Sequence, residues 1–165
     1  MSFPGQGGLR VLHIPARAGP AWWVYGDKDT IKVGNEDTGG AIAAVETVFK
    51  PGDGPPPHVH HNENEAFYVL EGEVAGLDGD RRFVAGPGSF VFFPQGSHHA
   101  FKNVGATTAK ILLLFFPAGS ENYLKEVGTP VVEGQEAPYT DLAIAARIAP
   151  KYGMGFVQVP PGVWE

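Results

Sequence analysis

Four side chains of the types that bind transition metals stand at spacings that allow them to converge. His58 and His60 are separated by one residue, and Glu65 opens the apolar run that follows them. Residues two apart in a β-strand point to the same face, so the two imidazoles can reach one ion at roughly 2.0–2.2 Å. Glu65 and, from a later apolar run, His99 can return to the same interior. The sequence therefore predicts a metal site with the ligands His58, His60, Glu65 and His99.

The chemistry of this ligand set points to a class of metal. Three imidazoles and one carboxylate suit Fe, Ni, Mn, Cu, Co or Zn, whereas Mg and Ca prefer sites built from oxygen ligands. Four protein ligands around an octahedral ion leave positions open for water, substrate or dioxygen. We therefore expect one divalent transition metal per chain, whose identity the sequence leaves open, in a reactive site.

Short strands joined by tight turns must position these side chains. The chain has 165 residues, of which 23 are Gly and 15 are Pro, and these are spread between short apolar runs. That pattern, without helical periodicity between the runs, is typical of an all-β barrel or sandwich. Core strands are expected at residues 41–49, 58–61, 65–70, 74–77, 82–85, 90–93, 99–104 and 110–116, and edge or lid strands at 9–14, 21–25 and 30–33.

Two short helices are expected after the last core strand. Ser120 can cap the first helix and Gly128 can end it, with Glu121 and Lys125 placed one turn apart. The second begins near Thr140 and carries apolar residues near one face. Both helices are predicted to cover one side of the barrel and to take no part in the chemistry.

Two longer motifs around the predicted ligands resemble those of the cupin superfamily. The first reads Gly52, five residues, His58, one, His60, four, Glu65, six, Gly72; the second reads Gly88, five residues, Pro94, one, Gly96, two, His99, three, Asn103. A lone His-x-His pair is more often a solvated loop cluster, but that explanation does not account for so long a pattern. The resemblance implies an all-β cupin barrel, that is, a double-stranded β-helix or jelly roll, with the same four metal ligands.

Other histidines and a second glutamate lie close to the predicted ligands. His61 and His98 each adjoin a ligand, and strand alternation sends them to the opposite face. Glu63 competes with Glu65 for the carboxylate position, but Glu65 has the spacing of the family motif and opens the apolar strand. His13 is expected at the surface or in a lid.

The motifs divide the chain into three parts. Residues 1–40 are expected to form an N-terminal arm and edge strands of the barrel, residues 41–117 the cupin barrel core with the metal site, and residues 118–165 the C-terminal helices packing on the barrel. No internal repeat is visible and no second His-x-His follows residue 99, which predicts one site per chain.

Within the superfamily, the chain resembles the single-domain relatives of quercetin 2,3-dioxygenase. The resemblance rests on residues 65–73, 86–94 and 117–119. It implies a metal-dependent dioxygenase that uses O2 to cleave a hydroxylated aromatic or enol-containing small molecule, with Glu65 as the catalytic base. Two alternatives stay open: a non-oxidative metal-dependent enzyme (an isomerase, cyclase, dehydratase or decarboxylase), and a cupin that binds a ligand without turnover.

Aromatic residues near the ligands are candidates for the substrate pocket. Phe67 shares strand parity with Glu65, and Phe101 shares it with His99. Packing in the barrel core is an equally good role for both. Phe92 is a further candidate for substrate binding.

Composition limits the partners and the location of the protein. The net charge is -6, from 12 basic and 18 acidic residues without a Lys/Arg cluster, which argues against nucleic acid. The absence of cysteine excludes disulfides and thiolate metal sites. The longest apolar run, residues 111–116, is far shorter than the ~20 residues of a membrane helix. Residues 1–8 do not resemble a signal peptide and are expected to be mobile, so a cytoplasmic protein is predicted. By resemblance we also expect a homodimer, formed through the N-terminal strands.

Overall fold

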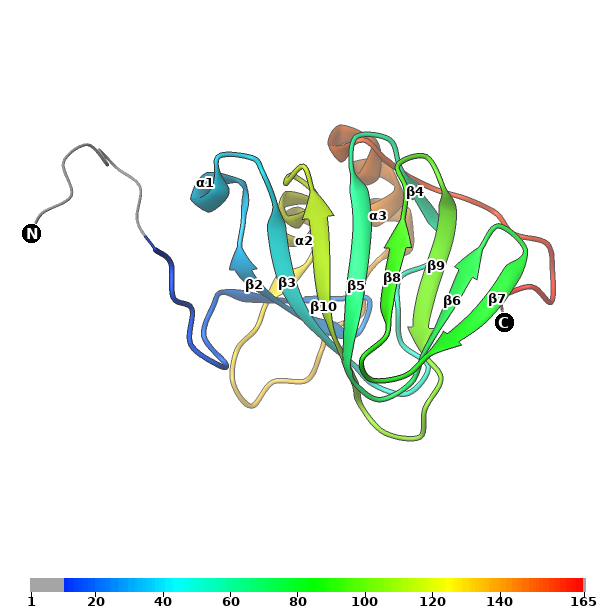
Figure 1. Cartoon of the computed structure of the whole chain (residues 1–165), viewed down its shortest axis with the longest axis horizontal. Coiled ribbons are helices and arrows are strands. Elements are labelled where there is room, and N and C mark those ends of the chain that lie inside the picture. Colours follow the sequence, from blue (N-terminus) through cyan, green and yellow to red (C-terminus); the bar gives the residue numbers. More distant parts are fainter. Residues whose placement is uncertain (1–10, 165) are drawn as a thin grey trace, which may run out of the picture.

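Two antiparallel sheets enclose one hydrophobic core in the computed structural model, which describes residues 11–164 (Figure 1). The larger sheet has the strand order β11-β1-β2-β3-β10-β5-β8, and the smaller has the order β12-β4-β9-β6-β7. The strands are β1 (Ala21–Val24), β2 (Asp27–Val33), β3 (Ala43–Phe49), β4 (His58–His60), β5 (Asn64–Glu71), β6 (Val74–Asp78), β7 (Arg81–Ala85), β8 (Phe90–Phe93), β9 (His98–Asn103), β10 (Ala109–Phe116), β11 (Thr129–Pro130) and β12 (Met154–Phe156). The predicted all-β fold with short C-terminal helices is confirmed.

Alternation along two central strands explains where the core lies. Every second residue of β3 and β10 is buried, beginning with Ala43 and Ala109. Because β10 lies between β3 and β5, Leu113 is opposite Val45 on one side and Phe67 on the other. These inward-facing apolar side chains leave water together, and the same alternation turns the intervening residues outward.

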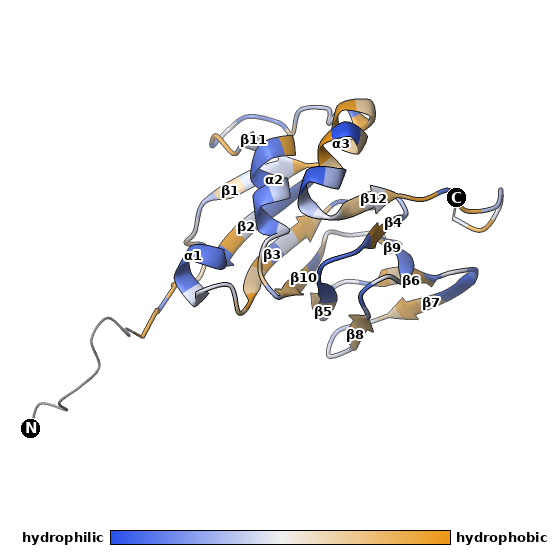
Figure 2. Ribbon diagram, turned by 90° about the horizontal axis from the view of Figure 1, so that it is seen from above, coloured by the Kyte–Doolittle hydropathy of each residue, from blue (hydrophilic) through white to orange (hydrophobic). Residues whose placement is uncertain are grey.

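The helices lie on the outside of the sheets. They are α1 (Asn35–Thr38), α2 (Glu121–Val127), α3 (Leu142–Ile148) and the 3-10 helix η1 (Ala149–Tyr152). Figure 2 shows α2 and α3 on the same side of the molecule, and α2 packs against both α3 and β1. Tyr123 and Leu124 of α2 are buried in the core. α2 therefore covers part of the core with its buried side chains.

The starts of the two predicted helices differ in detail from expectation. The prediction that Ser120 caps α2 is wrong, because its backbone is helical and its side chain makes no capping hydrogen bond. Its hydroxyl donates instead to Glu63, a partner far away in sequence. The second helix begins at Leu142 rather than near Thr140, because the Asp141 carboxylate accepts from the first free backbone N–H groups.

Both ends of the described chain also depart from the predicted strands. Residues 11–14 form no strand, although 9–14 was predicted as one, and Val11 is 97% exposed, so it has no core to pack on. The structure does not describe residues 9 and 10 of that range. It also does not describe residues 1–8, which were predicted to be mobile. Two short strands that the sequence did not indicate, β11 and β12, pair with β1 and β4. Within residues 11–164, no helix is both long enough and apolar enough to cross a membrane.

Candidate metal centre

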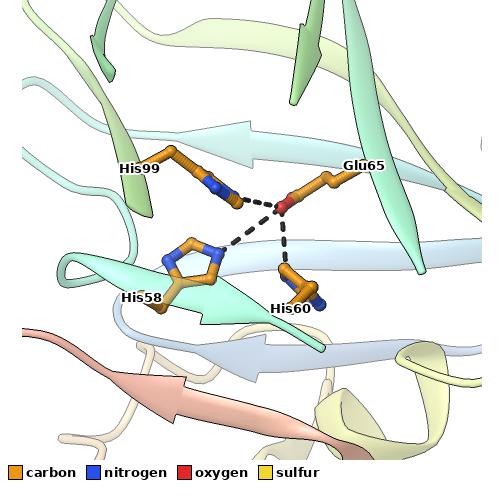
Figure 3. Close-up of side chains that lie close together, drawn as sticks. All are labelled: His58, His60, Glu65 and His99. Carbon is orange, nitrogen blue, oxygen red and sulfur yellow. Dashed lines mark hydrogen bonds and ion pairs between the residues drawn. The ribbon is translucent and has the colours of Figure 1, made fainter. Parts of the chain in front are cut away.

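Three strands bring the four predicted ligands to one place. β4 lies between β12 and β9, and His58 of β4 is directly opposite His99 of β9. His60 stands two residues further along β4, so its ring points to the same side as that of His58. Glu65, the second residue of β5, belongs to the other sheet. The four side chains meet between the sheets, as Figure 3 shows.

The imidazoles gather around one carboxylate oxygen. Glu65 Oε2 lies 2.7 Å from Nε2 of His99 and 3.0 Å from Nε2 of His60. Nε2 of His58 is 3.4 Å from the same oxygen. All four residues are buried, with at most 3% of their surface exposed. The four ligand atoms all lie within 4.8 Å of one another, so small side-chain adjustments would bring them to the ~2.1 Å at which a single transition metal binds each of them.

Backbone carbonyl groups fix the proton on two of the three rings. Nδ1 of His58 lies 2.9 Å from the carbonyl oxygen of Pro56, and Nδ1 of His99 lies 3.0 Å from that of Ser97. A carbonyl oxygen can only accept, so each Nδ1 must donate its proton. Each ring therefore turns its Nε2 toward Glu65, and Nε2 of His99 is within hydrogen-bond distance of the carboxylate, where a metal ion would take the place of a proton.

The third ring, His60, tests whether these residues fit a metal ion. Its Nδ1 donates to the carboxylate of Glu63, so its Nε2 also faces the cluster. That Nε2 is buried and, although 3.0 Å from Glu65, makes no hydrogen bond of acceptable geometry within residues 11–164. The ionised carboxylate of Glu65 needs a positive charge beside it, which a proton on His60 supplies in the metal-free protein and a bound cation would supply in its place. The donor set and its spacing therefore fit one transition-metal ion.

The charge states of the cluster agree with that fit. Burial lowers the pKa of His58 to about 4, so this ring is neutral at pH 7. Burial acts to raise the pKa of Glu65, but His60 and the other two rings hold it well below its usual value. Burial lowers the pKa of His60 as well, yet the carboxylates of Glu65 and Glu63 outweigh it and raise the pKa to about 9. A metal must displace that last proton, so its affinity is expected to rise with pH.

The sequence of the barrel matches a known protein family. The profile of the cupin domain matches residues 45–115, a range that includes all four residues of the cluster. This part of the chain, residues 45–115, therefore matches a cupin domain. A comparison with curated protein sequences finds no match.

Solved structures share the fold of this chain. A predicted oxalate decarboxylase from Thermotoga maritima has a TM-score of 0.60 at 18% identity, over 64% of this chain and 99% of its own. KdgF from Halomonas sp. has a TM-score of 0.54 at 19% identity, over 61% of this chain and 89% of its own. A sugar phosphate isomerase of the cupin superfamily from Silicibacter pomeroyi has a TM-score of 0.50 at 21% identity, over 57% and 61% respectively. At these identities the likeness establishes the fold alone.

Glu63 lies behind the four-residue cluster rather than in it. It is 3% exposed and accepts hydrogen bonds from Nδ1 of His60 and from the hydroxyl of Ser120. A carboxylate at this position fixes the orientation of a histidine ligand and makes the ring a stronger base. From the sequence, Glu63 was considered only as an alternative to Glu65 for the carboxylate ligand, and Ser120 was not predicted to be part of the site. The available signal was the need of every histidine ligand for a partner at its second nitrogen.

A small cavity adjoins the cluster. It has a volume of about 50 Å³ and is lined by His58, His60 and Glu65 together with apolar side chains. At ~10–15 Å³ for each enclosed water, it has room for only a few water molecules. Its apolar walls include Val24, Phe101, Leu113, Phe115, Leu124 and Met154. The candidate metal centre therefore opens onto a narrow, mainly apolar space.

Two of the three predicted pocket aromatics lie on the inner side of the sheets. Phe101 lines the cavity, with its ring centroid 6.4 Å from that of His58. Phe67 is fully buried one layer behind, 5.3 Å from Phe101 between ring centroids, and does not line the cavity. Its position is that of a core residue supporting Phe101.

Phe92, the third predicted pocket residue, lies on the outer face. It is 49% exposed and packs against Phe116, so the structure corrects its expected place in the pocket. Strand parity gives the reason, because β8 turns Phe93 inward and Phe92 outward. Phe93 stacks on the ring of His99, with centroids 4.2 Å apart and an interplanar angle of 11°. Phe93 therefore fixes the plane of one predicted ligand.

The remaining histidines lie away from the cluster. His61 and His98 are exposed, on the faces to which strand alternation sends them. His13 is exposed in the N-terminal segment.

Proposed function

We propose that this cupin is a metal-dependent dioxygenase of the quercetinase-like type, acting with O2 on a hydroxylated aromatic or enol-containing small molecule. One observation carries the proposal: the ligand atoms of three imidazoles and one carboxylate converge beside a mainly apolar cavity. An apolar cavity suits a ring or an enol, and a four-ligand site leaves coordination positions for reactants.

His58, His60, Glu65 and His99 would hold the metal ion, with Glu63 orienting His60. When bound, such an ion supplies Lewis acidity toward a substrate hydroxyl and, if redox-active, access to dioxygen chemistry. Its identity, among Fe, Ni, Mn, Cu, Co and Zn, is left to experiment because these ligands suit all of them.

Glu65 is the proposed catalytic residue. Its carboxylate is ionised, since the surrounding rings hold its pKa well below the usual range, and it borders the cavity. It would accept the proton of the substrate hydroxyl as general base. The resulting anion is electron-rich and would react with O2, with both oxygen atoms entering the cleaved product.

The cavity walls would select the substrate and keep water out. Phe101 and Phe115 offer faces for a planar ring, and Leu113 adds an aliphatic surface. Because the cavity is small, a compound with one ring or an enol fits the proposal better than a flavonol with three rings. A flavonol would have to displace side chains at the cavity mouth.

The predicted homodimer and cytoplasmic location stay predictions. Exposed apolar side chains on the outer face of the large sheet, among them Tyr68, Phe90 and Phe92, support an association between chains. Light scattering coupled to size-exclusion chromatography would give the number of chains in the particle.

Oxygen consumption tests the proposed reaction. Protein loaded separately with each candidate metal is mixed with catechol-like, enol and flavonol compounds in an oxygen electrode, and products formed under ¹⁸O2 are analysed by mass spectrometry. We expect metal-dependent uptake and two labelled oxygen atoms in the product. A product of unchanged mass formed without oxygen would replace the proposal with an isomerase or cyclase, and binding without turnover would replace it with a ligand-binding cupin.

A further inference from the structure

A second group of buried polar side chains borders the same cavity. Asp27 and Asp29 stand two residues apart on β2, so both face inward, and they are 3% and 5% exposed. Both line the cavity that His58 and His60 also line. Carboxyl groups are costly to bury without partners, so their place in an otherwise apolar wall needs an explanation.

The two acids differ in their hydrogen bonds. Asp29 Oδ1 accepts a hydrogen bond of 2.6 Å from the hydroxyl of Thr47, which lies opposite it on β3. Asp27 Oδ1 is buried and has no hydrogen-bond partner within residues 11–164. Burial, followed by the nearby carboxylates of Asp29 and Asp53, raises the pKa of Asp27 well above its usual value. A neutral carboxyl group keeps one acceptor oxygen, which is ready for a donor that residues 11–164 do not supply.

A tight turn holds Asp27 in this position. Tyr25 and Gly26 form the two-residue connection between β1 and β2, and both have positive φ angles, 55° and 89°. Two positive φ angles define the hairpin turn that matches strand twist, but a tyrosine rarely adopts this conformation. The hydroxyl of Tyr25 pairs with that of Tyr123 from α2, which ties the turn to the cavity wall.

The chemistry of the cavity limits what Asp27 could bind. A metal ion is a poor candidate, because the four-residue cluster is the only gathering of metal-ligand side chains found within residues 11–164. A neutral donor such as a hydroxyl group suits an acceptor in an apolar wall, since it carries no charge to bury. A substrate whose first oxygen lies at the histidine cluster could reach Asp27 with a second one.

We propose that Asp27 is a substrate-binding residue that accepts a hydrogen bond from a second hydroxyl group of the substrate, distant from the oxygen at the histidine cluster. The substrate class is therefore a small molecule with at least two hydroxyl groups. This inference rests on the proposed function for the place of the first oxygen.

Matched phenols test the proposal by isothermal titration calorimetry on the metal-loaded protein. Phenol has one hydroxyl group, whereas resorcinol and hydroquinone add a second at two different distances. We expect the wild-type protein to bind one of the two diols at least roughly tenfold more tightly than phenol. Asp27→Leu removes the acceptor and should abolish this preference, and Asp27→Asn, which keeps an acceptor oxygen, should retain part of it. Asp80→Asn, at an exposed turn, is the control and should keep all of it.

The melting temperature of the ligand-free protein gives a test that needs no probe. Asp27→Leu replaces an unpartnered buried carboxyl with an apolar group, so Tm should rise by roughly 3 °C or more. A fall in Tm would show that Asp27 has a structural partner and would overturn the proposal. So would a wild-type protein without preference for either diol, or a preference that survives in Asp27→Leu.

Metal content and oxygen uptake separate this inference from the proposed function. A protein that binds metal and prefers a diol but consumes no O2 would contradict the dioxygenase and leave Asp27 as a binding residue. A protein that consumes O2 equally well with Asp27→Leu at low substrate concentration would contradict the inference and leave the dioxygenase.

Discussion

The two ends of the cavity treat their buried polar groups differently. At the histidine end, the outer nitrogen of every ring has an acceptor: the carbonyl groups of Pro56 and Ser97, and the carboxylate of Glu63. At the acid end, Asp29 has Thr47, but one oxygen of Asp27 has no partner among the described residues. Complete support fixes a ligand set before anything binds, whereas an open acceptor leaves capacity for a ligand that arrives from outside.

The two ends also come from different parts of the chain. The histidine end lies on β4, β5 and β9, inside the range matched by the cupin profile, residues 45–115. The acid end lies on β2, before that range begins. A family match limited to the barrel core therefore includes the four clustered residues and leaves out Asp27, which we propose to accept a hydrogen bond from the substrate. This division explains why fold and ligands are easier to assign than the substrate.

Removing one imidazole of the histidine end is expected to have the largest effect. His99→Ala or His58→Ala should lower the metal content from about one ion per chain to a small fraction of it. The three donors that remain in each variant hold the ion much more weakly than four. Inductively coupled plasma mass spectrometry measures the content. His98→Ala, an exposed neighbour, is the matched control and should keep its metal. Full occupancy in both site variants would contradict the ligand assignment.

The two faces of β8 offer the next largest effect. Phe93→Ala removes a buried ring stacked on His99 and should lower the free energy of unfolding by about 3–5 kcal/mol. Phe92→Ala truncates a half-exposed ring and should cost about 1 kcal/mol or less. Urea unfolding of the metal-free proteins measures both values. Equal losses would contradict the assignment of Phe93 to the inner side and Phe92 to the outer side of β8.

Strand alternation and motif spacing predicted the fold and the convergence of the four ligands from sequence. They succeeded where polar and apolar residues alternate, as along β3. They failed on β8, because Phe90, Val91, Phe92 and Phe93 are all apolar and the run does not reveal which side faces the core. Parity in such a strand is set by its register with β5, where Glu65 lies opposite Phe93.

Long-range partners explain the other differences between prediction and structure. Ser120 has the sequence features of a helix cap, yet its hydroxyl binds Glu63, and only the packing of α2 against the barrel brings these residues together. Asp27 belongs to no motif and reads in sequence as an ordinary surface acid of a turn. It is buried beside a hairpin whose Tyr25 is hydrogen-bonded to Tyr123 of α2, a pairing that the sequence does not reveal.

A smaller effect is expected from removing the carboxylate that accepts a hydrogen bond from His60. Glu63→Gln keeps the shape of the side chain but removes the charge that accepts from Nδ1 of His60, and metal affinity should fall roughly 10–100-fold. Competition with a chromophoric chelator at fixed pH measures the change. Ser120→Ala removes only a donor to Glu63 and should have a lesser effect. An unchanged affinity in Glu63→Gln would show that the ring needs no carboxylate behind it.

The smallest expected effect concerns the pH dependence of the acid end. Burial raises the pKa of Asp29 to about 7 from its usual 3.8, although the hydrogen bond from Thr47 lowers it. Between these values the folded protein binds more protons at this site than the unfolded chain, so the stability contributed by neutral Asp29 is lost as pH rises toward 7. Asp29→Asn cannot ionise, so its stability relative to wild type should increase from pH 4 to pH 7, by an amount on the order of 1 kcal/mol.

Taking the difference between the two metal-free proteins removes the opposite contribution of His58, which is common to both. The pKa of His58 is lowered to about 4, so that ring adds stability as pH rises through its range. Chemical unfolding at several pH values, with a chelator present, supplies the two curves. A difference that stays constant from pH 4 to pH 7 would contradict this expectation. It would mean that Asp29 has the same pKa in the folded protein as in the unfolded chain, as it would if water or a cation reached the carboxylate freely.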